Sequence, residues 1–469
     1  MSWEETLKVI PDGVQTLSKM PNKHVNRVYP KYIDRAKGAY VWADGKKYID
    51  YPLGLGPVIL GHGHEYVNRA IVDQLQDGIV YSLPSKKETE LAVKICDIIP
   101  CAEKVRFVKT GSEATSAAVK IARAYTKREK VLCCGYHGWH DWFSIVNEKK
   151  DGIPTILGDL IEKFTYNDLD DFKSKLGDKH NCQIAAVIME PYILEEPKDS
   201  FLHEIRSLCT EYGIVFILDE VVTAFRTKKF SAQAYYGVTP DLTAIGKAMG
   251  NGMPIGCVCG KAEIMDVLLG DCFVSSTFGG ELASIAAALA TIEYMETHSV
   301  IDKIWRMGDR LIESFKTITD SMGISDKVYL KGLPPRTFFV FPTVEHKALF
   351  WQECLYRGVL LGYAQFISYS HDLNVIDETI TAMRGAMKIV RKHWDNPRQA
   401  LKGDPQEETF RLPESKEKEN GSKEDDNEAG ATNRDGSSNS KSVAKPEHGI
   451  AKNTVSPDGG RPIKVPAKL

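Results

Sequence analysis

A lysine and an aspartate each follow a short apolar run, at positions where two strands would end. Asp219 comes after residues 214–218, and Lys247 comes after residues 242–245, 28 residues further along the chain. A carboxylate at the end of a buried strand is costly unless a cation lies beside it, such as a lysine, a metal ion or a protonated heterocycle. A partly desolvated lysine can attack carbonyl carbons. The pair therefore indicates carbonyl chemistry centred on Lys247.

A second group of residues has the pattern of a phosphate-binding turn. Residues 104–108 read as a strand, and Thr110, Gly111, Ser112 and Glu113 follow it directly before a helical pattern. Free N–H groups and hydroxyls at a helix N-terminus bind phosphate, and glycine lets the backbone approach the anion closely. The same residues also fit a plain helix start, with Ser112 as the cap and Glu113 favouring the first turn.

A third group combines aromatic rings, histidines and a glycine after the strand predicted at 130–134. It reads YHGWHDW and begins with Tyr136 and His137. Aromatic faces at a strand end suit stacking on a flat ring. A core cluster whose histidines are hydrogen-bonded would give the same pattern, so this group alone does not decide between the two.

The three groups fall at successive strand ends, which is where ligands bind in an open parallel sheet. Pyridoxal phosphate (PLP) needs all of these features together. Its phosphate binds a cradle, its ring stacks, its pyridinium nitrogen pairs with an aspartate, and its aldehyde condenses with a lysine. The residues therefore predict a PLP site.

The surrounding motifs resemble those of the class III PLP-dependent aminotransferases. They are IDYPLGLGPVILGHGH, KTGSEAT, CGYHGWHDW, VIMEP, FILDEVVTAFR, GVTPDLTAIGKAMGNGMPIG and STFGGELASIAAALATIE, and the resemblance extends over about residues 8–394. Within that family the chain looks most similar to the branch around glutamate-1-semialdehyde 2,1-aminomutase and its relatives in sugar biosynthesis.

The resemblance implies a fold-type I homodimer with active sites at the subunit interface. It implies that Lys247 forms a Schiff base with PLP, that Asp219 keeps the pyridine nitrogen protonated, and that Tyr136 and Val221 contact opposite ring faces. Thr277 is expected to reach the phosphate bound by the neighbouring subunit. The full set of residues that the resemblance assigns to the cofactor is Thr110, Gly111, Ser112, Tyr136, His137, Glu190, Asp219, Val221, Lys247 and Thr277.

The expected reaction moves an amino group between a small amino donor and a carbonyl acceptor. The alternative is the aminomutase reaction, in which transfer stays within glutamate-1-semialdehyde and gives 5-aminolevulinate. Enzymes with that activity carry a PGGVNSPVR-like stretch whose arginine binds the substrate carboxylate, and the matching stretch here, PDGVQTLSK, ends in Lys19. Lysine does not bind a carboxylate bidentately, which argues against that substrate. Lys19 also fits a plain surface lysine, and Glu281 fits either a substrate-side acid or a helix cap.

Strand and helix patterns must alternate to bring these residues together. Such alternation predicts an α/β fold with a mainly parallel sheet flanked by helices, and the resemblance makes that sheet seven-stranded. We expect a large PLP-binding domain at 61–300 and a small α+β domain at 301–394 that includes the N-terminal segment 1–60. A polar stretch at 395–469 reads as a disordered tail, because it has too little apolar area to offset the entropy of ordering.

Composition limits the partners and the compartment. The chain is 43% hydrophobic and 26% charged, with a net charge of -3, so no general attraction to nucleic acid or anionic lipid is expected. Its apolar runs fall short of the ~20 residues of a membrane span, and its N-terminus does not look like a secretory signal. The ten cysteines lack zinc-site spacing. We therefore expect a cytoplasmic enzyme with reduced thiols and no metal site.

Overall fold

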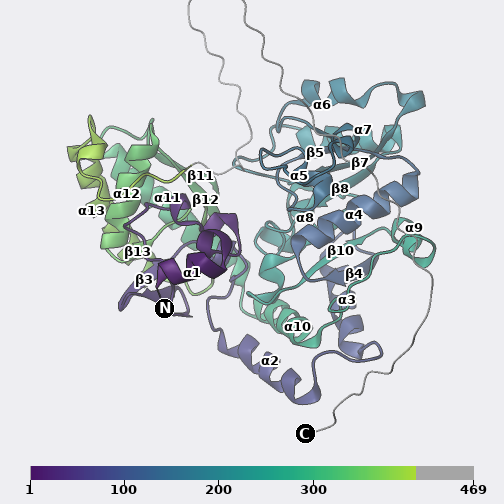
Figure 1. Cartoon of the computed structure of the whole chain (residues 1–469), viewed down its shortest axis with the longest axis horizontal. Coiled ribbons are helices and arrows are strands. Elements are labelled where there is room, and N and C mark those ends of the chain that lie inside the picture. Colours follow the sequence, from purple (N-terminus) through teal and green to yellow (C-terminus); the bar gives the residue numbers. More distant parts are fainter. Residues whose placement is uncertain (1, 408–469) are drawn as a thin grey trace, which may run out of the picture. The chain divides into compact units, whose positions relative to one another are not determined.

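A seven-stranded sheet in the order β4-β10-β9-β8-β7-β5-β6 organises the centre of the chain (Figure 1). The strands are β4 (Lys104–Val108), β5 (Lys130–Cys134), β6 (Ile161–Lys163), β7 (Ile184–Met189), β8 (Val215–Asp219), β9 (Leu242–Ile245) and β10 (Gly256–Gly260). Only β10 runs against its neighbours, β4 and β9. The prediction of a mainly parallel sheet is confirmed. The computed structural model describes residues 2–407 of the chain, and all of them belong to one compact unit.

Alternate side chains of the central strands enter two separate cores. On β7, Ala186 and Ile188 pack with α4 (Gly111–Thr126), whereas Val187 and Met189 pack with α6 (Leu169–Leu176) and α7 (Phe201–Tyr212). Every residue of β7 is buried. A strand covered on both faces must be apolar throughout, which explains the continuous IAAVIM run.

Further helices enclose this region. They are α2 (Glu65–Asp77), α3 (Lys86–Ile98) and α10 (Leu282–Thr297). α10 is buried around most of its circumference, which accounts for its alanine-rich, almost uncharged sequence. Among residues 2–407, no helix is both long enough and apolar enough to cross a membrane.

Two smaller sheets complete the described chain, and one of them joins its beginning to its later part. β1 (Arg35–Lys37), β2 (Tyr40–Ala43), β3 (Lys46–Asp50) and β13 (Val359–Leu360) form one sheet, in which β3 and β13 are parallel. β11 (Tyr329–Leu333), β12 (Arg336–Val340) and β14 (Gln365–Phe366) form the other. The accompanying helices are α11 (Val300–Asp320), α12 (Val344–Tyr356) and α13 (Leu373–Lys392). The exact division of the chain into domains stays a prediction.

The start of the predicted polar tail is packed. After a 3-10 turn at Pro397–Gln399, Asp404 and Asn26 exchange two backbone hydrogen bonds of 3.2 and 3.1 Å. The side chain of Gln352 accepts a 2.7 Å hydrogen bond from the Lys402 N–H. The boundary predicted at residue 395 is therefore corrected, because polar residues up to 407 find specific partners on the body of the protein. The rest of that prediction concerns residues outside the described part.

Candidate active site

A cavity of about 210 Å³ lies at the carboxyl ends of β5, β7, β8 and β9, beside the start of α4. β4, which leads into α4, is parallel to β9 because both are antiparallel to β10. Residues that follow these strands therefore reach one edge of the sheet. Those predicted for the cofactor and found in the cavity wall are Gly111, Ser112, Tyr136, His137, Glu190, Asp219, Val221 and Lys247.

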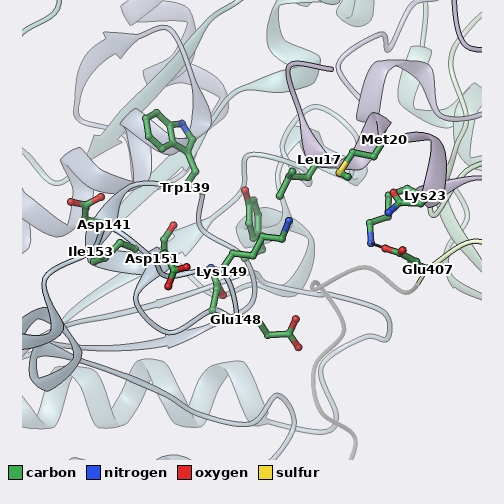
Figure 2. Close-up of a pocket in the computed structure, with 16 residues that line it drawn as sticks. Leu17, Met20, Lys23, Trp139, Asp141, Glu148, Lys149, Asp151, Ile153 and Glu407 are labelled. Atoms are coloured by element: carbon green, nitrogen blue, oxygen red, sulfur yellow. Dashed lines mark hydrogen bonds and ion pairs between the residues drawn. The ribbon is translucent and has the colours of Figure 1, made fainter. Parts of the chain in front are cut away.

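A larger cavity of about 580 Å³ adjoins the first, and Tyr136, Gly138 and Trp139 line both. Its other walls come from the N-terminal segment, including Leu17, and from the loop after β5 (Figure 2). That loop contributes charged side chains of both signs: Asp141, Glu148, Lys149 and Asp151. The larger cavity thus places a polar, charged surface next to the predicted cofactor pocket.

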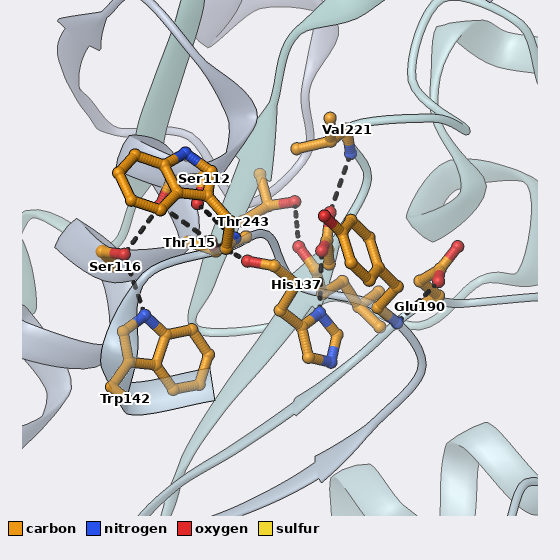
Figure 3. A network of polar contacts seen from close by, with 12 residues as sticks. Ser112, Thr115, Ser116, His137, Trp142, Glu190, Val221 and Thr243 are labelled. Atoms are coloured by element: carbon orange, nitrogen blue, oxygen red, sulfur yellow. Dashed lines mark hydrogen bonds and ion pairs between the residues drawn. The ribbon is translucent and has the colours of Figure 1, made fainter. Parts of the chain in front are cut away.

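Asp219 is held at the end of β8 by two hydrogen bonds, and their partners Val221 and His137 are labelled in Figure 3. One carboxylate oxygen accepts the Val221 N–H at 3.1 Å, and the other lies 2.8 Å from Nδ1 of His137. Because a carboxylate only accepts, Nδ1 of His137 carries the proton in this bond. Asp219 is only 4% exposed, so the network keeps a negative charge in a fixed place within a poorly solvated cavity.

His137 fits the interpretation of the YHGWHDW segment as a hydrogen-bonded core cluster, and stacking of this segment on a cofactor ring stays a prediction. Its ring is buried, stacks on Trp142 with centroids 6.3 Å apart, and meets Phe143 edge-on at 5.1 Å. Thr115 donates a 2.6 Å hydrogen bond to its carbonyl oxygen. His137 is therefore a packed core histidine that orients Asp219, while Tyr136 next to it lines the cavity.

The turn before α4 is capped by Thr110, not by Ser112. Oγ1 of Thr110 accepts the Glu113 N–H at 3.2 Å, and the Glu113 carboxylate accepts the Thr110 N–H at 2.8 Å. This capping box uses the Thr110 side chain, which is exposed and not part of the cavity wall. The N–H groups of Gly111 and Ser112 belong to the first turn, which has no acceptors within a helix, and both residues line the cavity.

Ser112 is packed tightly against the loop that follows Tyr136. Its hydroxyl accepts the Trp139 N–H at 3.0 Å and lies 2.5 Å from Nδ1 of His140. Gly138 has a φ of +107°, and a Cβ placed there would lie 2.1 Å from Oγ of Ser112. Only glycine satisfies both the backbone angle and the space at this position.

Lys247 occupies a strained backbone position. It opens the 3-10 turn Lys247–Gly250 after β9, with a φ of +41° that is rare for residues other than glycine. Asn251, at the end of this turn, accepts the Leu60 N–H at 2.8 Å and donates to the Gly61 carbonyl at 3.2 Å. Such strain persists where the surroundings fix it, and it is typical of functional sites.

Comparison with known proteins agrees with this geometry. The family model described as aminotransferase class-III matches residues 21–390. The chain belongs to the class III aminotransferases. It is 42% identical to a glutamate-1-semialdehyde 2,1-aminomutase of Sulfurisphaera tokodaii, over 64% of this chain and 74% of that protein. It is 33% identical to a 3-aminobutyryl-CoA aminotransferase of Cloacimonas acidaminovorans, over 83% of this chain and 96% of that one. The PLP internal aldimine form of the Sphingopyxis sp. MTA144 FumI protein superposes with a TM-score of 0.79 at 26% identity, covering 86% and 97% of the two chains.

Class III aminotransferases depend on PLP, and the cavity fits that cofactor. The buried carboxylate of Asp219 accepts hydrogen bonds from the Val221 N–H and from Nδ1 of His137, and a protonated ring nitrogen is a cation that such a carboxylate stabilises. The helix N-terminus at Gly111 offers N–H groups for a phosphate. Lys247 supplies an amine in the same cavity. These groups together match the phosphate, the ring and the aldehyde of PLP.

Four predicted site residues are not brought to the cavity within this chain. Thr110 caps α4, and Lys19 and Thr277 are exposed. Glu281 is the N-cap of α10 and forms a 2.9 Å ion pair with Lys109, which supports its interpretation as a capping acid. For Thr277, a position outside its own chain's cavity is what a role in a neighbouring subunit requires.

Sequence reasoning missed one charged residue of the cavity wall. Arg336 is the first residue of β12, in a sheet separate from the seven-stranded one, yet it lines the cavity together with Lys247. The available signal was a single arginine at the head of the apolar run TFFVF. A buried strand that begins with a charge indicates a site, because an isolated buried charge is costly.

Proposed function

We propose that this class III enzyme transfers an amino group from a small amino donor to a carbonyl acceptor, and that Lys247 is the residue that bonds to PLP. One observation above all supports the proposal. Lys247 lines the same cavity as Asp219, Tyr136 and the start of α4, although these residues come from separate parts of the sequence. A nucleophile, a buried anion, an aromatic ring and a phosphate-binding turn in one cavity form a complete set for PLP chemistry.

Each wall residue has a distinct task in this proposal. Bound PLP supplies an aldehyde that captures amines and a ring that withdraws electrons from the captured carbon. Asp219 holds the proton on the ring nitrogen, and His137 keeps that carboxylate oriented. Tyr136 and Val221 contact the two ring faces. The backbone of Tyr136 is fixed by its 2.9 Å hydrogen bond to the Glu190 carboxylate.

The amine of Lys247 moves the proton that the reaction requires. It removes the proton from the donor carbon that carries the amino group and would pass it to the cofactor, which would take up the electron pair, so that the donor carbon is oxidised. Water then replaces nitrogen on that carbon. The donor leaves as a carbonyl compound, and the amino group stays with the enzyme. The acceptor then reacts in the reverse order, so that its carbonyl oxygen leaves as water and Lys247 returns a proton to its carbon.

We infer that the enzyme works as a homodimer with shared active sites. Residues 79–83 and residues 273–282 form two neighbouring segments that expose large apolar side chains. Such an exposed apolar surface is unusual for a monomer. Leu83 and Phe273 are 79% and 74% exposed, and the Ile79 carbonyl bonds the Leu282 N–H at 2.9 Å, which ties the two segments together. The other exposed members of this apolar surface are Ile79, Val80, Tyr81 and Phe278. Thr277 directly precedes Phe278 and is exposed, so pairing of two such surfaces would place Thr277 at the subunit interface.

The aminotransferase reaction is preferred over the aminomutase reaction because Lys19, at the position expected to hold the aminomutase substrate, is exposed and lines neither cavity. The alternative is kept because several relatives are named glutamate-1-semialdehyde 2,1-aminomutase, at 36–42% identity.

The requirement for a separate amino donor distinguishes the aminotransferase reaction from the aminomutase reaction. The purified holoenzyme is given glutamate-1-semialdehyde with no amino donor, and in parallel a panel of amines with a carbonyl acceptor. We expect a donor from the panel to change the visible spectrum of the bound cofactor and to appear as its carbonyl product. Rapid formation of 5-aminolevulinate without any donor would instead establish the aminomutase reaction.

We further infer a cytoplasmic location, supported by the state of the thiols. All ten cysteines of the chain are free, and eight of them are buried. An enzyme of an oxidising compartment would be expected to pair some of them. Cell fractionation with an antibody to the protein tests this inference, and recovery with secreted or membrane fractions would contradict it.

A further inference from the structure

Arg336 stands out among the residues of the cavity wall because its charge is poorly satisfied. It is 9% exposed, and its Nε and Nη1 atoms are buried without any hydrogen-bond partner. The nearest carboxylate oxygen, on Glu190, lies 3.9 Å from Nη1, which is beyond the range of a charge-assisted hydrogen bond. Glu190 is itself engaged by the Tyr136 N–H.

A second buried arginine beside the same region shows the contrast. Arg226 is 1% exposed and donates to the carbonyls of Gly56 and Ile367 at 2.8 Å and of Pro335 at 3.2 Å. It does not line either cavity described above. Arg226 thus uses both Nη1 and Nη2 to bind the backbone, with only Nε left without a partner, and has a structural role, whereas Arg336 has both Nε and Nη1 without a partner on the wall of the cavity that contains Lys247.

The surroundings of Arg336 hydrogen-bond its guanidinium through the Tyr192 side chain but leave Nε and Nη1 without a partner. The guanidinium carbon lies 5.0 Å from the ring centre of Phe338 and 5.8 Å from that of Tyr192. Aromatic faces stabilise a cation but take none of its directional N–H bonds. Pairing of Arg336 with Phe366 in β14 fixes the backbone. The result is a positioned cation with free hydrogen-bonding capacity, facing the cavity that contains Lys247.

We propose that Arg336 binds a carboxylate of the amino-acid substrate and so restricts the enzyme to donors that carry an acid group. A carboxylate is the ligand that matches the planar donor array of a guanidinium. It would satisfy the idle N–H groups and balance the charge that Glu190 at 3.9 Å neutralises only in part. This inference rests on the proposed function, since it names the substrate class of that same site.

Paired substrates with and without the acid group test this assignment. Holoenzyme and the Arg336→Gln variant are mixed with L-glutamate, L-alanine and the α-amide of each, and the loss of the cofactor absorbance band is followed. The wild type should react faster with at least one acid than with its amide. Arg336→Gln should lose at least ~30-fold in kcat/KM toward that acid, change little toward the amide, and keep its bound cofactor.

Two further variants keep the test decisive. Arg336→Lys retains the positive charge and should therefore recover part of the preference for the acid. This variant keeps the test informative if Arg336→Gln folds poorly. Arg310→Gln is the matched control, because Arg310 is exposed and pairs with Asp377 at 2.6 Å on the surface. It should behave as the wild type.

Several results would overturn the assignment. They are equal rates of the wild type with acids and amides, reaction with neither acid, or an unchanged acid preference in Arg336→Gln. These outcomes are separate from failure of the proposed function itself, which would require that no amine of any kind alters the cofactor spectrum or yields a carbonyl product.

Discussion

Replacement of Gly138 by alanine tests whether the turn at Ser112 forms part of the cofactor site. Gly138 has a φ of +107°, and its added Cβ would lie 2.1 Å from Oγ and 2.8 Å from Cα of Ser112. Ordinary contact begins at 3.4 Å. Ser112 would therefore have to move by about 0.6 Å at Cα and about 1.3 Å at Oγ, because atoms closer than contact distance repel steeply.

Two contributions set the expected loss of folding free energy in Gly138→Ala: backbone strain and steric overlap with Ser112. An alanine with positive φ costs about 1–2 kcal/mol of folding free energy. Overpacking against Ser112 adds about 1–3 kcal/mol. Because the N–H groups of Gly111 and Ser112 line the cavity, a shift near 1 Å should also weaken PLP binding, by about 10- to 100-fold.

Gly358→Ala is the matched control for backbone strain. Gly358 has a φ of +84°, and its Cβ would meet only the Lys47 carbonyl oxygen at 3.7 Å, which is ordinary contact. Urea unfolding of the apoenzymes measures the folding free energy, and titration with PLP followed by absorbance measures the affinity. Gly138→Ala should be less stable than Gly358→Ala and should bind PLP more weakly. Equal PLP affinity in the two variants would refute the placement of the phosphate at this turn.

Three other predictions follow from separate parts of the structure. Asp219→Asn should retain cofactor but slow amino transfer about 10- to 100-fold, because a charge-assisted interaction is lost; an unchanged rate would exclude its role at the ring nitrogen. Burial, with a smaller effect from Lys31, lowers the pKa of His24 to about 4. The unfolded chain therefore binds more protons between pH 6.5 and 4, and stability falls as pH falls through that window. Relative to His24→Phe, the wild type should lose about 2 kcal/mol between pH 7 and pH 5 in urea titrations, and equal losses would contradict the pKa shift. Mixing inactive Lys247→Ala and Thr277→Glu subunits should restore activity, because one site of the mixed dimer then has both native residues; no recovery would contradict the shared site.

The central site was predictable because its residues follow strands of one sheet. Asp219, Lys247 and Tyr136 each come directly after an apolar run, and the parallel arrangement of such runs brings their ends to one edge. The continuous apolar run of β7 also predicts that its side chains pack alternately against helices on the two faces of the sheet. Local sequence was therefore sufficient for the sheet and for the residues at its edge.

The residues that were missed or misplaced depend on contacts between distant segments. Arg336 reaches the cavity from another sheet, so no local pattern connects it with Lys247. The polar stretch at 397–407 has the composition of a tail, yet Asp404 pairs with Asn26 near the other end of the chain. Composition records how much apolar area a segment can bury, but not whether its backbone groups find specific partners.

The most direct test of the account locates the covalent link to the cofactor. The holoenzyme is reduced with borohydride, which makes a bond between PLP and an amine permanent, and the peptides are mapped by mass spectrometry. We predict one phosphopyridoxyl group per chain, on Lys247. A group on a different lysine, or holoenzyme that yields no labelled peptide, would contradict the assignment of Lys247 and the mechanism built on it.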